Sequence, residues 1–197
     1  LWALARWGRR CAFAGVVGDD DAGEAIGSDL LAAGVDVGNL VVRPGHRSQE
    51  AFVTVAEGSG ERRIAWQRPT GPAPTPDDLH PPRARVFLTD GLFGETSWAL
   101  SHRDWRTVVD AGTLRPGTEA LLGRAREDVA SASLAPALPP RDDPGAAVAA
   151  IRARGPSVAA VTLGERGWVA SFGDRLVAGP ARKVAVVDTT GCGDAFR

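Results

Sequence analysis

The residues best suited to chemistry lie at the end of the sequence, where positions 186–197 read VVDTTGCGDAFR. We predict that VAVVD (184–188) forms a strand, that TTGCG forms a glycine-rich turn, and that Asp194 opens a helix. The backbone amides of residues 191–194 would then converge on one point at the N-terminus of that helix. Such amides are unpaired and, together with the helix dipole, they bind phosphate well.

Asp194 would lie beside an anion bound at this turn. A carboxylate in that place can accept a proton from a hydroxyl group while the amides neutralise charge on a phosphoryl group in transfer. The pattern therefore favours phosphoryl transfer of the kinase type. An alternative interpretation stays open, in which Asp188 is a turn residue and Asp194 is a first-turn carboxylate that the helix dipole stabilises.

The rest of the chain supplies the elements that must position this turn, because short apolar runs ending in glycine alternate with stretches of helical spacing. We predict strands in RCAFAGVVG (10–18), VFLTDG (86–91), TVVDAG (107–112) and SVAAVTLG (157–164), helices in DAGEAIGSDLLAAGV (21–35) and AAVAAIRARG (146–155), and a β-hairpin in SQEAFVTVAEGSGERRIAWQR (48–68). In the proline-rich stretch 68–85, Thr75 or Asp77 can cap a short helical turn. This order predicts an α/β fold with a mostly parallel sheet, helices on both faces and the hairpin as a flap, and ligands in such folds bind at the carboxyl ends of strands.

The composition is that of an ordinary globular protein, with 44% hydrophobic residues, 23 basic and 24 acidic side chains and a net charge of -1. Because the charges balance, the protein has no long-range positive electrostatic field that would attract a nucleic acid. No apolar stretch is long enough to cross a membrane. Cys11 and Cys192 are far apart and lack metal-ligand spacing, so we expect reduced thiols and a cytoplasmic protein. The chain begins on Leu1 and contains no methionine, and we expect it to be part of a longer protein.

Five segments of the chain carry motifs that follow one another in a specific order. They are GVVGDDDAGEAIGSDLLAAGVD (15–36), GSGERRI (58–64), VVDAGTLRPG (108–117), VTLGERG (161–167) and DTTGCGDAF (188–196). Together they resemble the motifs of the PfkB, or ribokinase-like, family of carbohydrate kinases. The resemblance implies a single ribokinase-like α/β domain over residues 1–197, incomplete at both ends, with a lid hairpin at about 45–70. A hairpin of this kind can pair with its copy in a homodimer.

The same resemblance implies an ATP-dependent kinase that acts on a small-molecule sugar, with Mg²⁺ and, in some members, K⁺. Asp194 would be the general base for the sugar hydroxyl. The other implied roles are the anion hole (Gly191, Cys192, Gly193), the nucleotide site (Thr162, Gly164, Gly167), substrate contacts (Asp90, Asp20) and a monovalent-cation site (Asp188, Thr190). For Asp20 we favour the simpler interpretation that it caps the following helix, and Asp188 and Thr190 are equally well explained as turn residues.

The sequence departs from the family at Ser133 and Pro136, which stand where many members carry the N-x-x-E motif that organises Mg²⁺ and phosphate. Ketohexokinase and sulfofructose kinase resemble this chain in that respect, and phosphates with water can hold Mg²⁺, so we interpret the change as the marker of a subgroup. A catalytically silent sugar- or nucleotide-binding homologue and another phosphate-binding α/β enzyme stay open as alternatives. Because only three residues follow Asp194, too few to hold helical geometry unaided, we expect this 197-residue chain by itself to be inactive.

Overall fold

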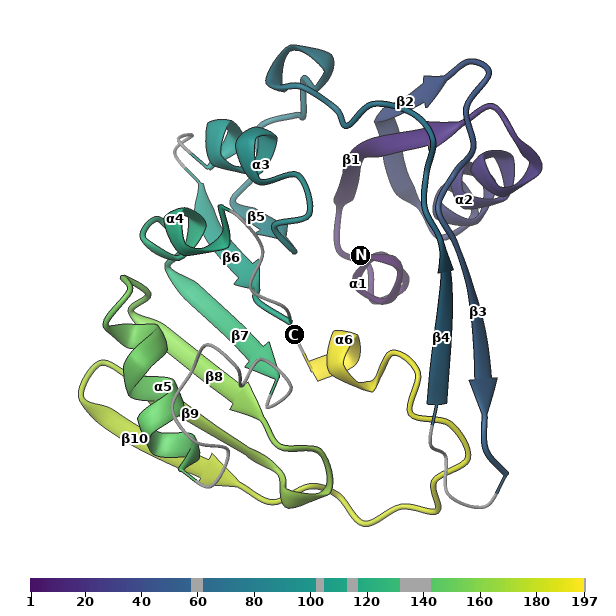
Figure 1. Ribbon diagram of the computed structural model, residues 1–197. Helices are drawn as coiled ribbons and strands as arrows, with labels where there is room; N and C mark the ends of the chain where they lie inside the picture. Colours follow the sequence, from purple (N-terminus) through teal and green to yellow (C-terminus); the bar gives the residue numbers. More distant parts are fainter. Residues whose placement is uncertain (58–61, 102–104, 113–116, 132–142, 197) are drawn as a thin grey trace. The chain divides into compact units, whose positions relative to one another are not determined.

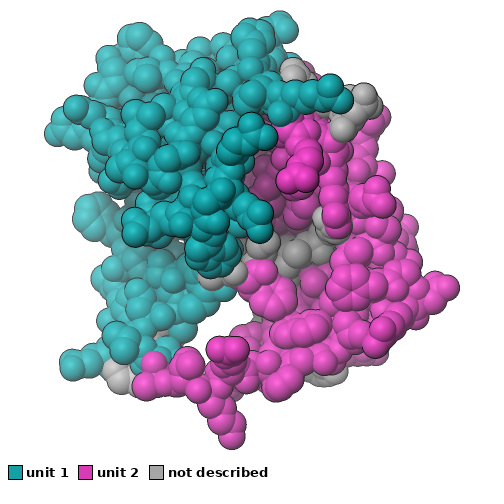
Figure 2. Space-filling model, turned by 180° about the vertical axis from the view of Figure 1, so that it is seen from behind, with its two compact units in different colours: residues 1–83, 186–195 teal, residues 84–185, 196–197 magenta. Residues whose placement is uncertain are grey.

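The computed structural model of the chain describes residues 1–57, 62–101, 105–112, 117–131 and 143–196 (Figure 1). The chain divides into two compact units, coloured separately in Figure 2. Unit 1 comprises Leu1–Arg83 and Val186–Ala195, and unit 2 comprises Ala84–Ala185 and Phe196–Arg197. The expectation of one domain over residues 1–197 stays a prediction, and each unit is described by itself.

Unit 1 is built on a pair of parallel strands, β1 (Cys11–Gly18) and β2 (Val35–Arg43), joined by helix α2 (Asp21–Ala32). A short helix that was not among the predicted elements, α1 (Trp2–Arg6), precedes them. The turn from β1 into α2 is tight, because a Cβ atom at Gly23 would lie 2.2 Å from the carbonyl oxygen of Gly18. Only glycine allows this approach, which explains why the sequence motif 15–36 has a glycine at position 23.

The predicted hairpin is confirmed as an antiparallel pair, β3 (Glu50–Val55) with β4 (Arg62–Gln67), in which Val53 lies opposite Ile64. Its turn, residues 58–61, lies outside the described residues. Since successive side chains of a strand point to opposite faces, one face carries Val53, Val55, Arg62, Ile64 and Trp66. All of these side chains are exposed.

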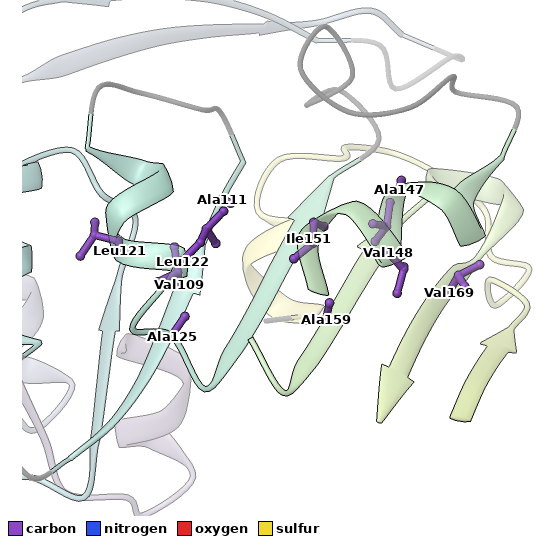
Figure 3. Close-up of a cluster of buried hydrophobic side chains, with 11 residues drawn as sticks. Val109, Ala111, Leu121, Leu122, Ala125, Ala147, Val148, Ile151, Ala159 and Val169 are labelled. Carbon is purple, nitrogen blue, oxygen red and sulfur yellow. The ribbon is translucent and has the colours of Figure 1, made fainter. Parts of the chain in front are cut away.

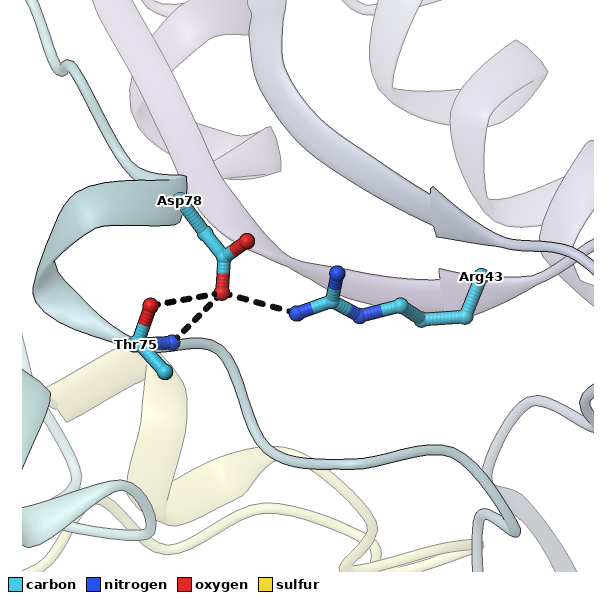
Figure 4. Close-up of polar contacts among 3 residues, drawn as sticks. All are labelled: Arg43, Thr75 and Asp78. Atoms are coloured by element: carbon cyan, nitrogen blue, oxygen red, sulfur yellow. Dashed lines mark hydrogen bonds and ion pairs between the residues drawn. The ribbon is translucent and has the colours of Figure 1, made fainter.

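The proline-rich connection after the hairpin contains a 3-10 helix, Pro76–Asp78, and its N-cap is Thr75, one of the two residues predicted for this role, and not Asp77. Figure 4 shows that one carboxylate oxygen of Asp78 gathers three donors. They are the Thr75 amide at 2.7 Å, the Thr75 hydroxyl at 2.9 Å and the Arg43 guanidinium at 2.8 Å. The contact fixes this connection to the end of strand β2.

Unit 2 is a six-stranded sheet with the strand order β10-β9-β8-β7-β6-β5. The strands are β5 (Val86–Thr89), β6 (Arg106–Asp110), β7 (Glu127–Ser131), β8 (Val158–Thr162), β9 (Trp168–Phe172) and β10 (Arg175–Gly179), and the helices are α3 (Gly94–Leu100), α4 (Thr118–Leu122) and α5 (Pro144–Arg152). Strands β5 to β8 are parallel, whereas β9 and β10 are antiparallel. The predicted α/β fold with a mostly parallel sheet is thereby confirmed.

The core of unit 2 lies between this sheet and helices α4 and α5 (Figure 3). Its members are aliphatic and almost fully buried: Val109, Ala111, Leu121, Leu122, Ala125, Ala147, Val148, Ile151, Ala159, Val161 and Val169. Asp143 begins α5 by accepting a hydrogen bond from the Ala146 amide at 2.8 Å. Pro144 follows at the first helical position, where its missing N–H costs nothing. These local signals explain why the helix predicted over 146–155 forms.

The strand predicted for VAVVD (184–188) is wrong, because these residues form no strand and lie exposed. Val187, for example, is 83% exposed. An apolar β-branched run becomes a strand only where a neighbour supplies ladder hydrogen bonds, and no described strand pairs with this one. The helix after it, α6 (Cys192–Phe196), begins at Cys192 and not at Asp194, so the predicted turn is shorter than expected.

Candidate functional site

The residues with the strongest chemical signal form one continuous segment of unit 1, which we call the glycine loop (residues 188–194). The Thr190 amide donates to the Asp188 carboxylate at 2.7 Å, and Gly191 has a φ of 74°, a left-handed conformation that favours glycine. The Cys192 amide donates to the Thr189 carbonyl at 3.3 Å. The turn therefore already uses one of the three amides that the sequence assigns to an anion hole. Asp194 follows, exposed, in the first turn of α6.

Asp188 opens the glycine loop as an ionised turn residue. The hydrogen bond from the Thr190 amide is the main reason that the pKa of Asp188 lies below its usual value, and the Thr190 hydroxyl and the positive charge of Arg62 add to the effect. The turn-residue interpretation of Asp188 is thus satisfied by the geometry. An exposed carboxylate with a neighbouring hydroxyl also offers oxygen ligands to a cation.

A hairpin side chain reaches the glycine loop, which was not among the sequence-based predictions. The Arg62 guanidinium on β4 donates from Nη1 to the Thr189 carbonyl oxygen at 2.5 Å and to the Thr189 hydroxyl at 3.1 Å. The two residues are 127 positions apart in the chain, so no local pattern could have indicated the contact.

Asp20, the second acidic residue predicted in unit 1, is the N-cap of α2, which confirms the capping interpretation. Its Oδ1 accepts from the Gly23 amide at 3.0 Å and from the Ser48 hydroxyl at 2.6 Å, and its Oδ2 accepts from the Ser48 amide at 2.9 Å. The Ser48 side chain contributes most to lowering the pKa of Asp20. Ser48 is itself buried, with 1% exposure, and accepts from the Gly18 amide at 2.9 Å.

The predicted nucleotide residues lie in unit 2, at the turn between β8 and β9. Thr162 is the last residue of β8, and the turn is closed by hydrogen bonds from the Leu163 amide to the Gly167 carbonyl at 2.8 Å and from the Gly167 amide to the Gly164 carbonyl at 3.0 Å. Gly167 has a φ of 94°, and a Cβ atom there would lie 2.0 Å from the carbonyl oxygen of Gly179. Backbone conformation and space thus both require glycine at this position.

The remaining predicted substrate residue, Asp90, directly follows β5 in the same sheet. Its Oδ1 accepts from the Leu92 amide at 2.9 Å. Because β5 and β8 belong to the parallel part of the sheet, Asp90 and Thr162 lie at the carboxyl edge where ligands bind in such folds.

The structure thus places the predicted residues in two groups. Unit 1 holds Asp20, Asp188, Thr190, Gly191, Cys192, Gly193 and Asp194, and unit 2 holds Asp90, Thr162, Gly164 and Gly167. Ser133 and Pro136 lie outside the described residues. In the part of the chain that the structure describes, no three His, Cys, Asp or Glu side chains gather as a metal site, and no helix is long and apolar enough to span a membrane.

Comparison with known proteins matches the chain to the description "pfkB family carbohydrate kinase" over residues 1–112 and 118–197. Fructokinase-1 of Oryza sativa subsp. japonica is 30% identical over 226 residues, an alignment that covers 98% of this chain and 68% of that protein.

Among solved structures, aminoimidazole riboside kinase from Salmonella enterica, complexed with aminoimidazole riboside and an ATP analog, is 26% identical. Its TM-score is 0.75, over 99% of this chain and 70% of that one. Ribokinase from Thermotoga maritima is 18% identical, with a TM-score of 0.78 over 99% of this chain and 68% of that one.

Proposed function

Since the chain belongs to the pfkB family of carbohydrate kinases, we propose that it carries the site of an enzyme that transfers the γ-phosphoryl group of ATP to a sugar hydroxyl. Asp194 is the general base in this proposal, and the amides of Gly191, Cys192 and Gly193 form the anion hole, for which the Cys192 amide exchanges the Thr189 carbonyl for the phosphoryl group. The observation that carries it is the glycine loop, in which a left-handed Gly191 leads into a helix with an exposed aspartate in its first turn.

Each part of the glycine loop has a defined task in the transfer. The Asp194 carboxylate takes the proton of the attacking hydroxyl, whose oxygen forms a bond to the γ-phosphorus as the bond to the leaving ADP oxygen breaks. The amides at the start of α6 stabilise the charge on the phosphoryl oxygens. Positioning and electrostatics supply most of the acceleration in such transfers, so one base beside an anion hole is sufficient.

Thr162, Gly164 and Gly167 are the proposed nucleotide contacts, and Asp90 is the proposed sugar contact. Asp20 already accepts three hydrogen bonds within unit 1, so its contribution would be to hold the end of β1 in place. ATP brings Mg²⁺ as its counter-ion. Because no acidic cluster gathers in the described residues, phosphate oxygens and water would supply most of its ligands.

Two further roles belong to this proposal. Asp188 and Thr190 are exposed and carry oxygen ligands, as a site for K⁺ requires.

The hairpin would cover the sugar with the face that holds Val53, Ile64 and Trp66. The name of the rice relative suggests fructose as the first sugar to test.

The decisive experiment replaces Asp194 by asparagine in the complete protein. Asp194→Asn keeps the size of the side chain but cannot take up the proton, so we expect kcat to fall by about 10²- to 10⁴-fold, with binding of sugar and nucleotide retained. Asp174→Asn, in the exposed turn between β9 and β10, is the matched control. ADP release is measured against fructose, ribose and nucleosides, with KCl or tetramethylammonium chloride as the salt.

Three results would contradict parts of this assignment. Near-normal turnover of Asp194→Asn would remove Asp194 as the base. A wild-type protein that binds ATP but releases no ADP with any sugar would be the catalytically silent homologue. Equal rates in both salts would exclude a catalytic role for K⁺ at Asp188 and Thr190.

A further inference from the structure

We propose that Thr89 and Ser97 are positioning residues of the sugar site, because their buried hydroxyl pair holds the turn that carries Asp90. The inference rests on the proposed function, in which Asp90 contacts the sugar. It assigns a task to two residues that lie outside the five sequence motifs.

The first argument is the burial of the two hydroxyl groups. Thr89 ends β5 and is 9% exposed, and Ser97 in α3 is 7% exposed. Their oxygen atoms lie 2.8 Å apart and share a hydrogen bond. Burying a hydroxyl group is unfavourable unless it is hydrogen-bonded, and valine, with nearly the same shape as threonine, suits a strand without this requirement. The two polar side chains therefore occur here as a pair.

The second argument is the turn after β5, in which two successive amides bind the side chains of the two residues before them. The Gly91 amide donates to Thr89 Oγ1 at 3.0 Å, and the Leu92 amide donates to Asp90 Oδ1 at 2.9 Å. The Asp90 carboxylate is thus attached to the turn that Thr89 holds. A change in the direction of this turn would change the direction of the carboxylate.

The third argument is the packing of the same turn against helix α4. Gly91 has a φ of 70°, and a Cβ atom there would lie 3.3 Å from Thr118 Oγ1 and 3.4 Å from Leu121 Cδ1. Thr118 and Leu121 are both fully buried. The turn is therefore held from two sides, by packing against α4 and by the hydroxyl pair that joins it to α3.

The fourth argument is the precision that a sugar contact requires. Hydrogen bonds between hydroxyl groups and carboxylate oxygens have donor–acceptor distances of about 2.5–3.0 Å and weaken as they lose alignment. A displacement well below the size of an atom is therefore enough to weaken the binding of a sugar hydroxyl to Asp90. Thr89 and Ser97 would act on the sugar only through this carboxylate.

The test compares the KM for fructose with the KM for ATP in the complete protein, measured by ADP release. Thr89→Val removes one hydroxyl group and keeps the shape, so we expect the KM for fructose to rise about 3- to 12-fold and the KM for ATP to stay almost unchanged. Thr89→Ser keeps the hydroxyl group and should restore the wild-type KM. Thr107→Val makes the same change at a 2% exposed threonine near the start of β6, and it should resemble wild type.

Two double variants show whether the hydroxyl groups act together and through Asp90. Ser97→Ala should raise the KM for fructose by a factor similar to that of Thr89→Val, and the two changes combined should have no larger effect than either alone. In an Asp90→Ala background, Thr89→Val should have no further effect on the KM for fructose. A merely structural role would produce the same loss in both backgrounds.

Several outcomes would overturn the inference. An equal rise in both KM values, or an undiminished effect of Thr89→Val in the Asp90→Ala background, would show that the hydroxyl group acts on the fold in general. Wild-type KM values in both Thr89→Val and Ser97→Ala, with Asp90→Ala impaired, would remove the positioning role alone. A wild-type protein that releases no ADP with any sugar would instead contradict the proposed function, and the inference would fail with it.

Discussion

Three aspartates of unit 1 have a lowered pKa, and each owes it to a different partner. For Asp20 the main cause is the Ser48 hydroxyl, for Asp188 it is the Thr190 amide, and for Asp78 it is the Arg43 side chain. Two of these partners are neutral groups of neighbouring loops, whereas Arg43 is a full charge. The Asp78 contact is therefore the most suitable for a test by pH.

Asp78 should make the stability of the protein depend on acid pH. Its pKa is lowered from 3.8 to about 2, so its contribution is fully present above 3.8 and is lost as the pH falls towards 2. At pH 7, Asp78→Asn should have a lower free energy of unfolding than wild type. This difference in unfolding free energy should shrink as the pH falls from 3.8 to about 2.

Urea unfolding at a series of pH values measures the effect of Asp78. Asp77→Asn, the exposed neighbour in the same 3-10 helix, is the control and should follow wild type throughout. A difference between wild type and Asp78→Asn that stays constant down to pH 2 would show that the carboxylate charge is not responsible.

Among the elements, the β8–β9 turn has a backbone conformation that depends on one glycine, Gly167. A Cβ atom at Gly167 would overlap the Gly179 carbonyl oxygen. The φ of Gly167, 94°, is also unfavourable for any residue other than glycine. We predict that Gly167→Ala lowers the free energy of unfolding by about 2 kcal/mol or more, because strain and overlap add.

The matched control for Gly167 is Gly173, in the turn between β9 and β10. It has a φ of 58°, but a Cβ atom there would have no neighbouring atom within 4 Å. Gly173→Ala should therefore show the backbone strain alone, about 1 kcal/mol. Similar losses for both variants in urea unfolding would show that the approach to Gly179 is not tight.

The hairpin also makes a prediction about assembly. Phe52 lies on the face opposite Arg62 and is 74% exposed, and the β3–β4 pair has open edges in the described chain. We propose that this hairpin pairs with its copy in a homodimer, as exposed strand edges and apolar side chains favour.

Sedimentation of the complete protein tests the dimer. Phe52→Asp should shift the protein towards the monomer, whereas Leu176→Asp, which replaces a 57% exposed leucine on β10, should not. A wild-type protein that is monomeric at concentrations well above those of the assay would exclude this role of the hairpin.

For the chain in its entirety, local patterns predicted most elements, and distant contacts decided the rest. Helix α5 follows from Asp143, Pro144 and an apolar period, and the hairpin follows from alternation around a glycine turn. The strand expected at 184–188 failed because strand formation depends on a ladder partner that the run itself does not specify. The glycine loop was correctly placed next to a helix, but the arginine that contacts it comes from 127 positions away.

Ser48 anchors the base of the hairpin. Its buried side chain joins the Gly18 amide and the Asp20 carboxylate two residues before β3 begins, so the base of the hairpin is fixed to the end of β1. A rotation about this base would displace each residue in proportion to its distance along the strands. Arg62 is the residue of β4 furthest from the base, so within β4 its charge would move most relative to the glycine loop.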